Sequence, residues 1–433
     1  MKGTLLVILW SAVLACMPNG AKAAAKASIG GRALSAHTIV YASDAEAEVG
    51  SDAAAYMQQA LQGATGAWLA IADEGKVGRG SAIRLINDST LAPFGYDIRL
   101  EGRTLAVRAG GCWAMQQAAR LVAERLKGGG RIAAGFRLEG SVMGEHLFPL
   151  AEGANLRILD DNIWDYSAET IPDAWQKAGV DPRDDVRAPQ FAQLVRAYMP
   201  DVVTLQEYSK HMHDRFYPLI QRHGYVISWE SKADWNNTPI FYRPETLEQL
   251  YVNYNLYTPA RWSNAGSKSF ASAVFRHRAT GKVFAVITTH LWYMNEKRQP
   301  GSTQARAAQV RLMLAEAEVI RAQYDCPVFV TGDMNCYEST IPMQQFFEVG
   351  FQPCYKLATI FADNSNGHHI CSPGEGYSRK SRRPSRERTE GAIDHCLLLD
   401  GQKRIEVKTF DCVQAYFTIK LTDHYPNVID AKL

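Results

Sequence analysis

The sequence predicts a protein of the α/β (α+β) class with two domains behind an export signal. A chain of 433 residues is longer than a domain with a single hydrophobic core usually is. Short apolar runs typical of strands alternate with segments of helical periodicity, and the pattern changes near Asn155. Hydrophobic content of 46%, charged content of 21% and a net charge of +2 indicate a globular protein with no overall attraction to nucleic acid or membranes.

Residues 1–23 predict a signal peptide. Lys2 precedes an apolar run over residues 5–15, which is too short to span a bilayer but fits a signal-peptide core. Ala21-Lys22-Ala23 fits cleavage for ordinary secretion, whereas Val13-Leu14-Ala15-Cys16 is similar to a bacterial lipobox. Lipidation of Cys16 is the one membrane contact that we expect. Both alternatives place the protein outside the cytoplasm, as a secreted, periplasmic or cell-surface lipoprotein.

Residues 36–145 predict a small α+β domain. We expect strands at 38–42, 82–86, 96–100 and 104–109, and helices at 52–61 and 111–126. The hairpin Y-x-I-x-L-E-G-R-x-L-x-V from Tyr96, followed by glycine and a helix to Leu126, resembles the small N-terminal domain of β-hexosaminidases and α-glucuronidases. The resemblance implies an exported, glycan-active context and carries over no catalytic residue. A generic docking domain is the alternative.

Residues 155–433 predict the larger, second domain. Its expected helices lie at 189–199 and 303–323, and its strands at 156–159, 202–205, 240–242, 271–276, 283–289, 328–330 and 393–399. The strand at 328–330 leads into Gly332, where the backbone can approach a ligand closely. Asp333 and Asn335 project together beyond it, and alternation turns Met334 back into the core. A carboxylate beside an amide suits a water, a hard metal ion or a phosphoryl group.

Polar side chains lie at or near the ends of six apolar runs. Each residue alone is typical of a turn, but six strand ends with the same chemistry predict one shared site. These residues are Asn162, Glu207, His290, Asp333 with Asn335, Asp394, and Asp423 with His424.

In this order, the motifs around these residues resemble the endonuclease/exonuclease/phosphatase superfamily. They are N-I-W, P-D-V-V-T-L-Q-E, T-T-H-L, G-D-M-N, I-D-H and T-D-H-Y-P, and R-x-x-Q at Arg306 and Gln309 also fits. The resemblance covers residues 155–433. It implies the deoxyribonuclease I-like fold, a β-sandwich of two mixed sheets flanked by helices, and divalent-metal phosphoesterase activity.

The chemistry expected of the residues follows from their types. Glu207 and Asn162 suit Mg²⁺ (or Mn²⁺), and Asp423 orients the metal or His424. Asp333 positions or deprotonates the attacking water, and Asn335 holds that water or a phosphate oxygen. The resemblance assigns Asp394 as the partner of His290.

His290 and His424, if protonated, donate to the phosphoryl group, and nearby carboxylates favour the protonated state. The expected catalytic residues are therefore His290, Asp333, Asn335, Asp394 and His424. Which histidine is the acid and which the base stays open.

The substrate is less well defined. The segment 378–390 holds six basic and two acidic residues, an excess of +4, and Arg379, Arg382 and Arg383 are candidates for binding a polyanion such as nucleic acid. A solvated loop is the alternative. Trp235, Trp262, Trp292 and Tyr293 could line a sugar or lipid-headgroup pocket, or else pack in the core. The aromatic-Arg pair of inositol polyphosphate 5-phosphatases is absent after Asn335, which argues against that activity.

The leading hypothesis is an exported, metal-dependent phosphodiesterase that acts on nucleic acid or on a phospholipid- or glycan-linked phosphate. A phosphomonoesterase of the same fold is the second. An inactive glycan-binding module is the alternative from another class, and the complete motif set argues against it. The oligomeric state stays open.

Overall fold

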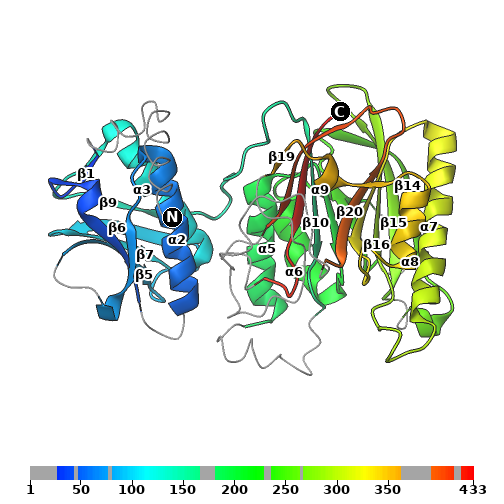
Figure 1. Cartoon of the computed structure of the whole chain (residues 1–433), viewed down its shortest axis with the longest axis horizontal. Coiled ribbons are helices and arrows are strands. Elements are labelled where there is room, and N and C mark those ends of the chain that lie inside the picture. The colour runs from blue at the N-terminus through cyan, green and yellow to red at the C-terminus, as the bar shows by residue number, and fades with distance from the viewer. Residues whose placement is uncertain are drawn as a thin grey trace, which may run out of the picture. The chain divides into compact units, whose positions relative to one another are not determined.

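The computed structural model describes residues 27–42, 47–76, 80–165, 181–228, 236–263, 267–361, 392–413 and 421–433. The chain divides into two compact units, residues 1–143 and 144–433 (Figure 1). The predicted signal peptide with Cys16, the basic segment with Arg379, Arg382 and Arg383, and Trp235 all lie outside the described residues. Within the described ranges, no helix is both long enough and apolar enough to cross a membrane.

The first unit contains a six-stranded sheet with two helices packed on it. The predicted hairpin is confirmed, since the two strands pair from Tyr96–Ala109 to Glu101–Thr104. The sheet order is β4-β3-β5-β7-β6-β9, of which the first four strands are parallel neighbours. The resemblance to the small domain of β-hexosaminidases stays a prediction. The elements are β3 (His37–Tyr41), α2 (Ala47–Thr65), β4 (Ala70–Asp73), β5 (Ser81–Asn87), β6 (Gly95–Glu101), β7 (Thr104–Ala109), α3 (Cys112–Leu126) and β9 (Arg137–Ser141).

The second unit is a sandwich of two mixed sheets. One sheet has the order β12-β13-β11-β10-β22-β21-β19 and the other β14-β15-β16-β17-β20-β18. Figure 1 shows α5 and α6 beside the first sheet and α7 and α8 beside the second. The predicted two-sheet architecture flanked by helices is therefore confirmed.

The first sheet consists of β10 (Leu156–Asn162), β11 (Val202–Gln206), β12 (Val226–Ser228), β13 (Ile240–Tyr242), β19 (Ile360–Phe361), β21 (Glu406–Cys412) and β22 (Asn427–Lys432). The second consists of β14 (Leu247–Leu256), β15 (Ser269–His277), β16 (Val283–His290), β17 (Val328–Asp333), β18 (Gln352–Pro353) and β20 (Asp394–Leu399). The flanking helices are α5 (Asp184–Tyr198), α6 (Lys210–Gln221), α7 (Ser302–Tyr324) and α8 (Ile341–Glu348).

Alternation along β17 explains how the sandwich orders the site. Phe329 is buried in the core between the two sheets, whereas Val330 and Met334 are buried in the core under α7 and α8. Asp333 has the parity of Phe329, so its side chain points into the space between the sheets at the strand end. Met334 turns into the core, as predicted.

Some elements differ from the prediction. β10 runs to Asn162 instead of ending at Leu159, because Asp160 and Asp161 continue the strand although both carboxylates are buried. Helix α6 was not predicted, and it forms although Pro218 lies inside it. The Ser209 hydroxyl caps its N-terminus by accepting a hydrogen bond from the Met212 amide at 3.0 Å. Strands β14, β21 and β22 were not predicted.

Gly332 permits a close approach between two strands, and its predicted approach to a ligand stays a prediction. Its φ is +128°, and a Cβ atom there would lie 2.1 Å from the Thr289 carbonyl oxygen of β16. Strands β16 and β17 are parallel, with Thr289 opposite Gly332 and His290 opposite Asp333. A glycine is therefore required for the register that brings His290 beside Asp333.

We predict that Gly332→Ala lowers the free energy of unfolding by at least about 3 kcal/mol, because both the φ angle and the Thr289 carbonyl oppose a side chain. Denaturant titration measures the loss. The control is Gly401→Ala, whose Cβ would meet nothing within 4 Å, and which should stay within about 1 kcal/mol of the wild type. Equal stability of the two variants would contradict the steric requirement at Gly332.

Candidate active site

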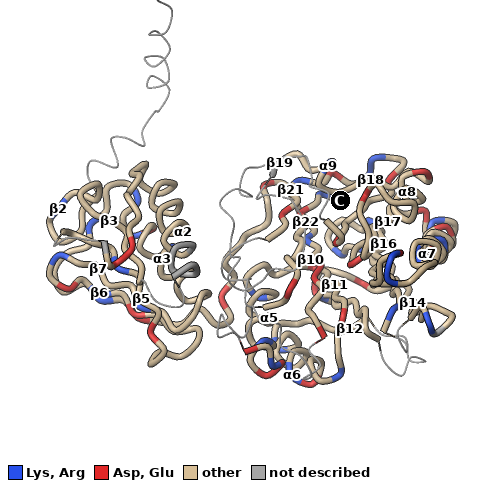
Figure 2. Tube along the Cα trace, turned by 60° about the horizontal axis from the view of Figure 1, so that its bottom comes forward, with Lys and Arg blue, Asp and Glu red and all other residues tan. Residues whose placement is uncertain are grey.

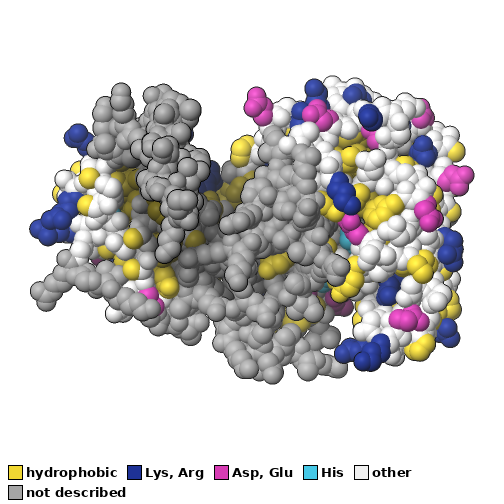
Figure 3. All heavy atoms as spheres, in the orientation of Figure 1, with side chains coloured by type: hydrophobic (Ala, Val, Ile, Leu, Met, Phe, Trp, Pro, Cys, Tyr) yellow, Lys and Arg dark blue, Asp and Glu magenta, His cyan; other side chains and the backbone are white. Residues whose placement is uncertain are grey.

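The predicted residues converge where four central strands end. Parallel β10 and β11 place Asn162 opposite Gln206, with Glu207 next in the chain, while parallel β16 and β17 place His290 opposite Asp333. β10 and β11 face β16 and β17 across the sandwich, so the four ends meet. Figure 2 shows acidic positions at β10 in the interior of the second unit, and in Figure 3 histidine and acidic side chains lie together in a hollow beside apolar ones.

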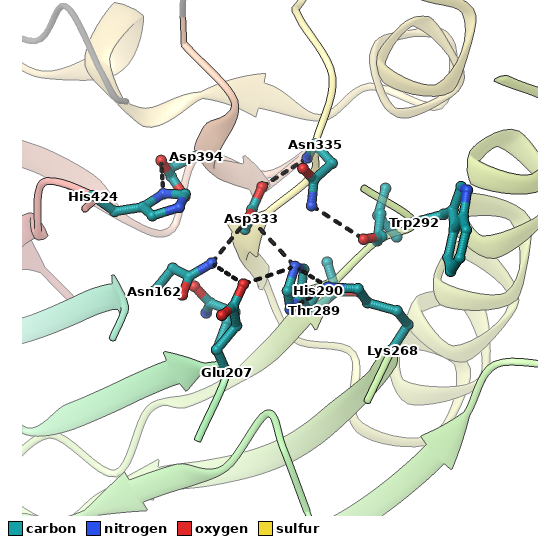
Figure 4. A network of polar contacts seen from close by, with 12 residues as sticks. Asn162, Glu207, Lys268, Thr289, His290, Trp292, Asp333, Asn335, Asp394 and His424 are labelled. Atoms are coloured by element: carbon teal, nitrogen blue, oxygen red, sulfur yellow. Dashed lines mark hydrogen bonds and ion pairs between the residues drawn. The ribbon is translucent and has the colours of Figure 1, made fainter. Parts of the chain in front are cut away.

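Asp333 is the centre of the site (Figure 4). Its Oδ2 lies 3.0 Å from the Asn162 amide nitrogen and 3.4 Å from His290 Nε2. Its Oδ1 accepts a hydrogen bond from the Asn335 backbone amide at 2.8 Å. Glu207 Oε1 lies 3.3 Å from the same Asn162 nitrogen and 3.7 Å from His290 Nε2. Two carboxylates thus share one amide and one imidazole.

Strained backbone positions Glu207. Its φ is +56°, a left-handed conformation that costs about 1–3 kcal/mol for a residue with a side chain. The Asp165 backbone amide donates to Oε2 at 2.9 Å, and the Glu207 side chain remains 28% exposed. Asp333 and His290 are almost fully buried. Glu207 is therefore the site carboxylate with the most open access to solvent and ligands.

The orientation of Asn162 bears on its expected metal role. Its Oδ1 accepts a hydrogen bond from the Trp164 amide at 3.0 Å, and its nitrogen points to Glu207 and Asp333. An amide that ligates a metal through oxygen must face the other way, and rotating the amide by half a turn exchanges the two atoms. Metal ligation by Asn162 stays a prediction.

Asp394 is the partner of His424, so the predicted pairing with His290 is wrong. The two Asp394 oxygens lie 2.9 and 3.1 Å from His424 Nδ1. Asp394 begins β20 opposite Asp333, and His424 lies in the segment before β22, which pairs with β10. The Thr422 hydroxyl donates to the Asn162 carbonyl at 2.5 Å and thereby fixes this segment on the end of β10. Asp423 Oδ1 lies 3.8 Å from His424 Nε2.

The two histidines have opposite electrostatic surroundings. Burial alone would lower the pKa of His424, but the charges of Asp394, Asp423 and Asp333 outweigh it and raise the pKa well above its usual value. Burial lowers the pKa of His290 well below its usual value, and the Lys268 cation acts in the same direction. The expectation that carboxylates keep both histidines protonated therefore fits His424 and is wrong for His290.

The carboxyl groups respond to the same burial. Burial raises the pKa of Asp333 to about 7, and the neighbouring Asp394 charge adds to the increase. Burial likewise raises the pKa of Asp423. A carboxyl with a pKa near neutrality is suited to accept a proton from water at physiological pH.

Lys268 is a site residue that the sequence analysis missed. It precedes β15, whose Phe270 pairs with Thr289, so it reaches the same strand-end edge as His290. Its Nζ lies 3.0 Å from His290 Nδ1 and is also in contact with Nε2. No motif surrounds Lys268. The strands at 271–276 and 283–289 were predicted, and their antiparallel pairing is the signal that could have placed it.

Arg306 and Gln309 support the loops around this edge. Gln309 accepts a hydrogen bond from the Trp292 amide and donates to the Trp262 carbonyl, both at 2.9 Å. Arg306 donates to the carbonyls of Trp292 and Met294 at 3.0 and 2.8 Å. The R-x-x-Q pair of α7 therefore holds the backbone of the loops at this edge.

The aromatic candidates divide into two groups. Trp262 and Trp292 are buried and pack edge to face with ring centroids 5.6 Å apart. Core packing is thus confirmed for both. Tyr293 is 45% exposed and stacks at a tilt against Trp292, with ring centroids 5.0 Å apart.

The donor set fits a hard divalent cation. Within the described ranges, one group of three His, Cys, Asp or Glu side chains has ligand atoms within 4.8 Å of one another: Asp333, Asp394 and His424. Glu207 adds a carboxylate beside Asp333, and the ligands suited to a metal here are the carboxylate oxygens, because a protonated His424 cannot ligate one. Oxygen-rich sets of this kind select Mg²⁺, Mn²⁺ or Ca²⁺ over softer metals.

Comparisons with known proteins agree with this geometry. The model of the endonuclease/exonuclease/phosphatase family matches residues 179–424, more than half of the chain and all the site residues except Asn162. Among curated proteins, none matches this sequence significantly.

Solved structures match the second unit. A mannosyl-6-phosphatase from Bacteroides thetaiotaomicron is 16% identical, with 64% of this chain and 99% of that chain covered and a TM-score of 0.50. The human Nocturnin catalytic domain with bound sulfate is 19% identical over 64% of this chain and 93% of that chain, with a TM-score of 0.44. At these identities the first similarity shows a shared fold.

We predict that Asp394→Asn lowers the pKa of His424 in metal-free protein, because an anion hydrogen-bonded to Nδ1 stabilises the imidazolium and an amide does not. Histidine ¹H–¹⁵N NMR during a pH titration measures this pKa. Asp214→Asn, on the exposed face of α6, is the control and should leave it unchanged. An unaltered His424 titration in Asp394→Asn would contradict the pairing.

Proposed function

Because the chain belongs to the endonuclease/exonuclease/phosphatase family, whose members are phosphoester hydrolases, we propose that it hydrolyses a phosphoester with a water activated at Asp333. The observation that carries the proposal is the arrangement around Asp333. A buried carboxylate with a pKa of about 7 lies between the Glu207 carboxylate and the Asp394–His424 pair. This arrangement combines a base, an acid and an oxygen-rich ligand set in one place.

Asp333 acts as the general base. The Asn335 amide and the Asn162 side chain orient its two oxygens, so a water on its open side would lose a proton to it as the oxygen attacks phosphorus. The Asn335 side chain donates to the Leu291 carbonyl at 3.2 Å, which holds the turn after β17 in place. Burial assists the reaction, because a poorly hydrated carboxylate is a stronger base.

His424 acts as the cationic donor. Asp394 holds its Nδ1, and its Nε2, which lies 3.8 Å from Asp423 Oδ1, would donate to a phosphoryl oxygen or give a proton to the leaving oxygen. A bound Mg²⁺ or Mn²⁺ would neutralise charge on the non-bridging oxygens. Glu207 would hold that ion, with Asn162 and Asp423 beside it. The dependence on a metal ion is part of this proposal.

The finer proposal is a phosphodiester substrate: nucleic acid, or a phosphate linked to a phospholipid or a glycan. Attraction of a polyanion by Arg379, Arg382 and Arg383 belongs to the same proposal. The similarity to a solved mannosyl-6-phosphatase supports a phosphomonoester as the second candidate. Relative kcat/KM for bis-p-nitrophenyl phosphate and p-nitrophenyl phosphate separates the two.

Export is proposed from the sequence of residues 1–23, with secretion, a periplasmic location and lipidation at Cys16 as alternatives. A glycan-linked substrate would suit the context implied by the resemblance of the first unit. An inactive glycan-binding module is disfavoured, because binding a glycan gives no reason to bury Asp333, Asp394 and His424 together.

We predict that Asp333→Asn lowers kcat for bis-p-nitrophenyl phosphate at least about 1,000-fold, since the amide cannot accept the proton. Thermal unfolding should not weaken, because a neutral amide replaces a buried charge. The matched control is Asp325→Asn, a carboxylate 83% exposed at the end of α7, which should retain full activity. Substantial hydrolysis by Asp333→Asn would refute the assignment.

We also predict that Glu207→Gln raises the Mg²⁺ concentration for half-maximal activity about 10-fold or more, because the variant loses the anionic ligand. A Mg²⁺ titration of the hydrolysis rate measures this effect. Glu245→Gln, whose side chain is 79% exposed, is the control. An identical Mg²⁺ titration in Glu207→Gln would exclude Glu207 as a metal ligand.

A further inference from the structure

Lys268 is a buried cation with unused hydrogen-bonding capacity. The residue is 4% exposed, similar to the motif residues around it. Within the described ranges, its ammonium makes no ion pair with a carboxylate within 4.0 Å, and its hydrogen-bond partner is the His290 ring. An ammonium has three N–H donors, whereas a neutral imidazole offers one acceptor nitrogen. Among the residues that the structure describes, two of its donors therefore have no acceptor.

The surroundings of this ammonium favour an anionic ligand. Burying a cation without a paired carboxylate is unfavourable, and an anion bound beside it offsets this cost. Burial lowers the pKa of Lys268, and the charges of Glu207, Asp333 and Asp165, none of which contacts it, oppose that decrease and favour the ammonium. The Tyr293 ring lies on another side, with its centroid 5.4 Å from Nζ. A metal cation would be repelled by Lys268, so an anion is the ligand that its charge selects.

The backbone holds Lys268 firmly in this position. Its amide donates to the Ser263 carbonyl, and its carbonyl accepts from the Tyr257 amide, both at 3.0 Å. Tyr257 is buried, and its hydroxyl hydrogen-bonds the Thr289 hydroxyl at 2.7 Å. The residue before His290 is thus tied to the segment that carries Lys268. Such preorganisation is what a transition-state donor requires.

We propose that Lys268 is a catalytic residue that binds a non-bridging oxygen of the substrate phosphoryl group. In the view of Figure 4, Lys268 and His424 lie on opposite sides of Asp333, so the phosphoryl group would have a cationic donor on each side of the attacking water. This role rests on the proposed hydrolysis of a phosphoester. Lys268 would then supply the positive charge that was predicted for a protonated His290.

The test compares Lys268→Met, Lys268→Gln and Lys268→Arg with the wild type. Lys282→Met, an exposed lysine in the turn between β15 and β16, is the matched control. Three quantities are measured: kcat/KM for a nitrophenyl phosphoester, the Mg²⁺ concentration for half-maximal activity, and the dissociation constant of inorganic phosphate by calorimetry with Mg²⁺ present.

We expect Lys268→Met and Lys268→Gln to lower kcat/KM about 100- to 1,000-fold and to weaken phosphate binding about 10-fold or more. Lys268→Arg should retain part of the activity and part of the phosphate affinity. Lys282→Met should change neither kcat/KM nor phosphate binding. The Mg²⁺ concentration for half-maximal activity should stay equal or fall, because a neighbouring positive charge has been removed.

Unchanged phosphate binding in the folded Met and Gln variants overturns the proposal, as does a change confined to the Mg²⁺ requirement. Calorimetry separates this failure from that of the proposed function. If the wild type hydrolyses no phosphoester, phosphate binding by the wild type and Lys268→Met still decides whether Lys268 binds the anion.

Discussion

The close approach of Gly332 to the Thr289 carbonyl sets the register on which the site depends. With φ at +128° and a carbonyl where a Cβ atom would lie, this position accepts glycine alone. The approach places His290 opposite Asp333 across parallel strands, and the next antiparallel pair places Asp394 opposite Asp333. A slip of one residue would turn Asp333 towards the core under α7 and α8. One backbone contact thus orders three functional side chains.

The site also depends on how the fold distributes buried charge. Carboxylates from both sheets lie within a few ångströms of one another, and burial raises the pKa of Asp333 to about 7. Asp160 lies two residues before Asn162 on β10, on the same face of the strand, and accepts hydrogen bonds from Thr204 and Gln206 at 2.7 and 2.9 Å. Burial raises the pKa of Asp160 to about 7 as well. This concentration of acidic groups disfavours the metal-free state and favours a cation.

The sequence predicted much of the site because its residues follow strands in a fixed order. Asn162, Glu207, His290, Asp333 and His424 each lie just beyond an apolar run, and their convergence follows from sheet geometry alone. Sheet geometry alone does not determine which carboxylate contacts which histidine. The Asp394–His424 contact depends on how β20 and the segment before β22 lie against β10, and no local pattern records that arrangement. Strand β14 was not predicted either, because its sequence alternates weakly between apolar and polar residues and it is half-buried along most of its length.

Lys268 is a candidate functional residue that the order of the sequence motifs does not reveal. It belongs to none of the sequence motifs, and its place in the site arises from the register of a hairpin and from the hydrogen bonds that fix its backbone. The same cation changes the interpretation of His290, since a buried imidazole beside an ammonium resists protonation. A neutral His290 can accept from Lys268 with Nδ1, while Nε2, which Lys268 also contacts, faces Asp333 and Glu207. His290 then serves to aim Lys268 and to separate it from the carboxylates, so the positive charge on this side of the site resides on lysine and the positive charge on the other side resides on His424.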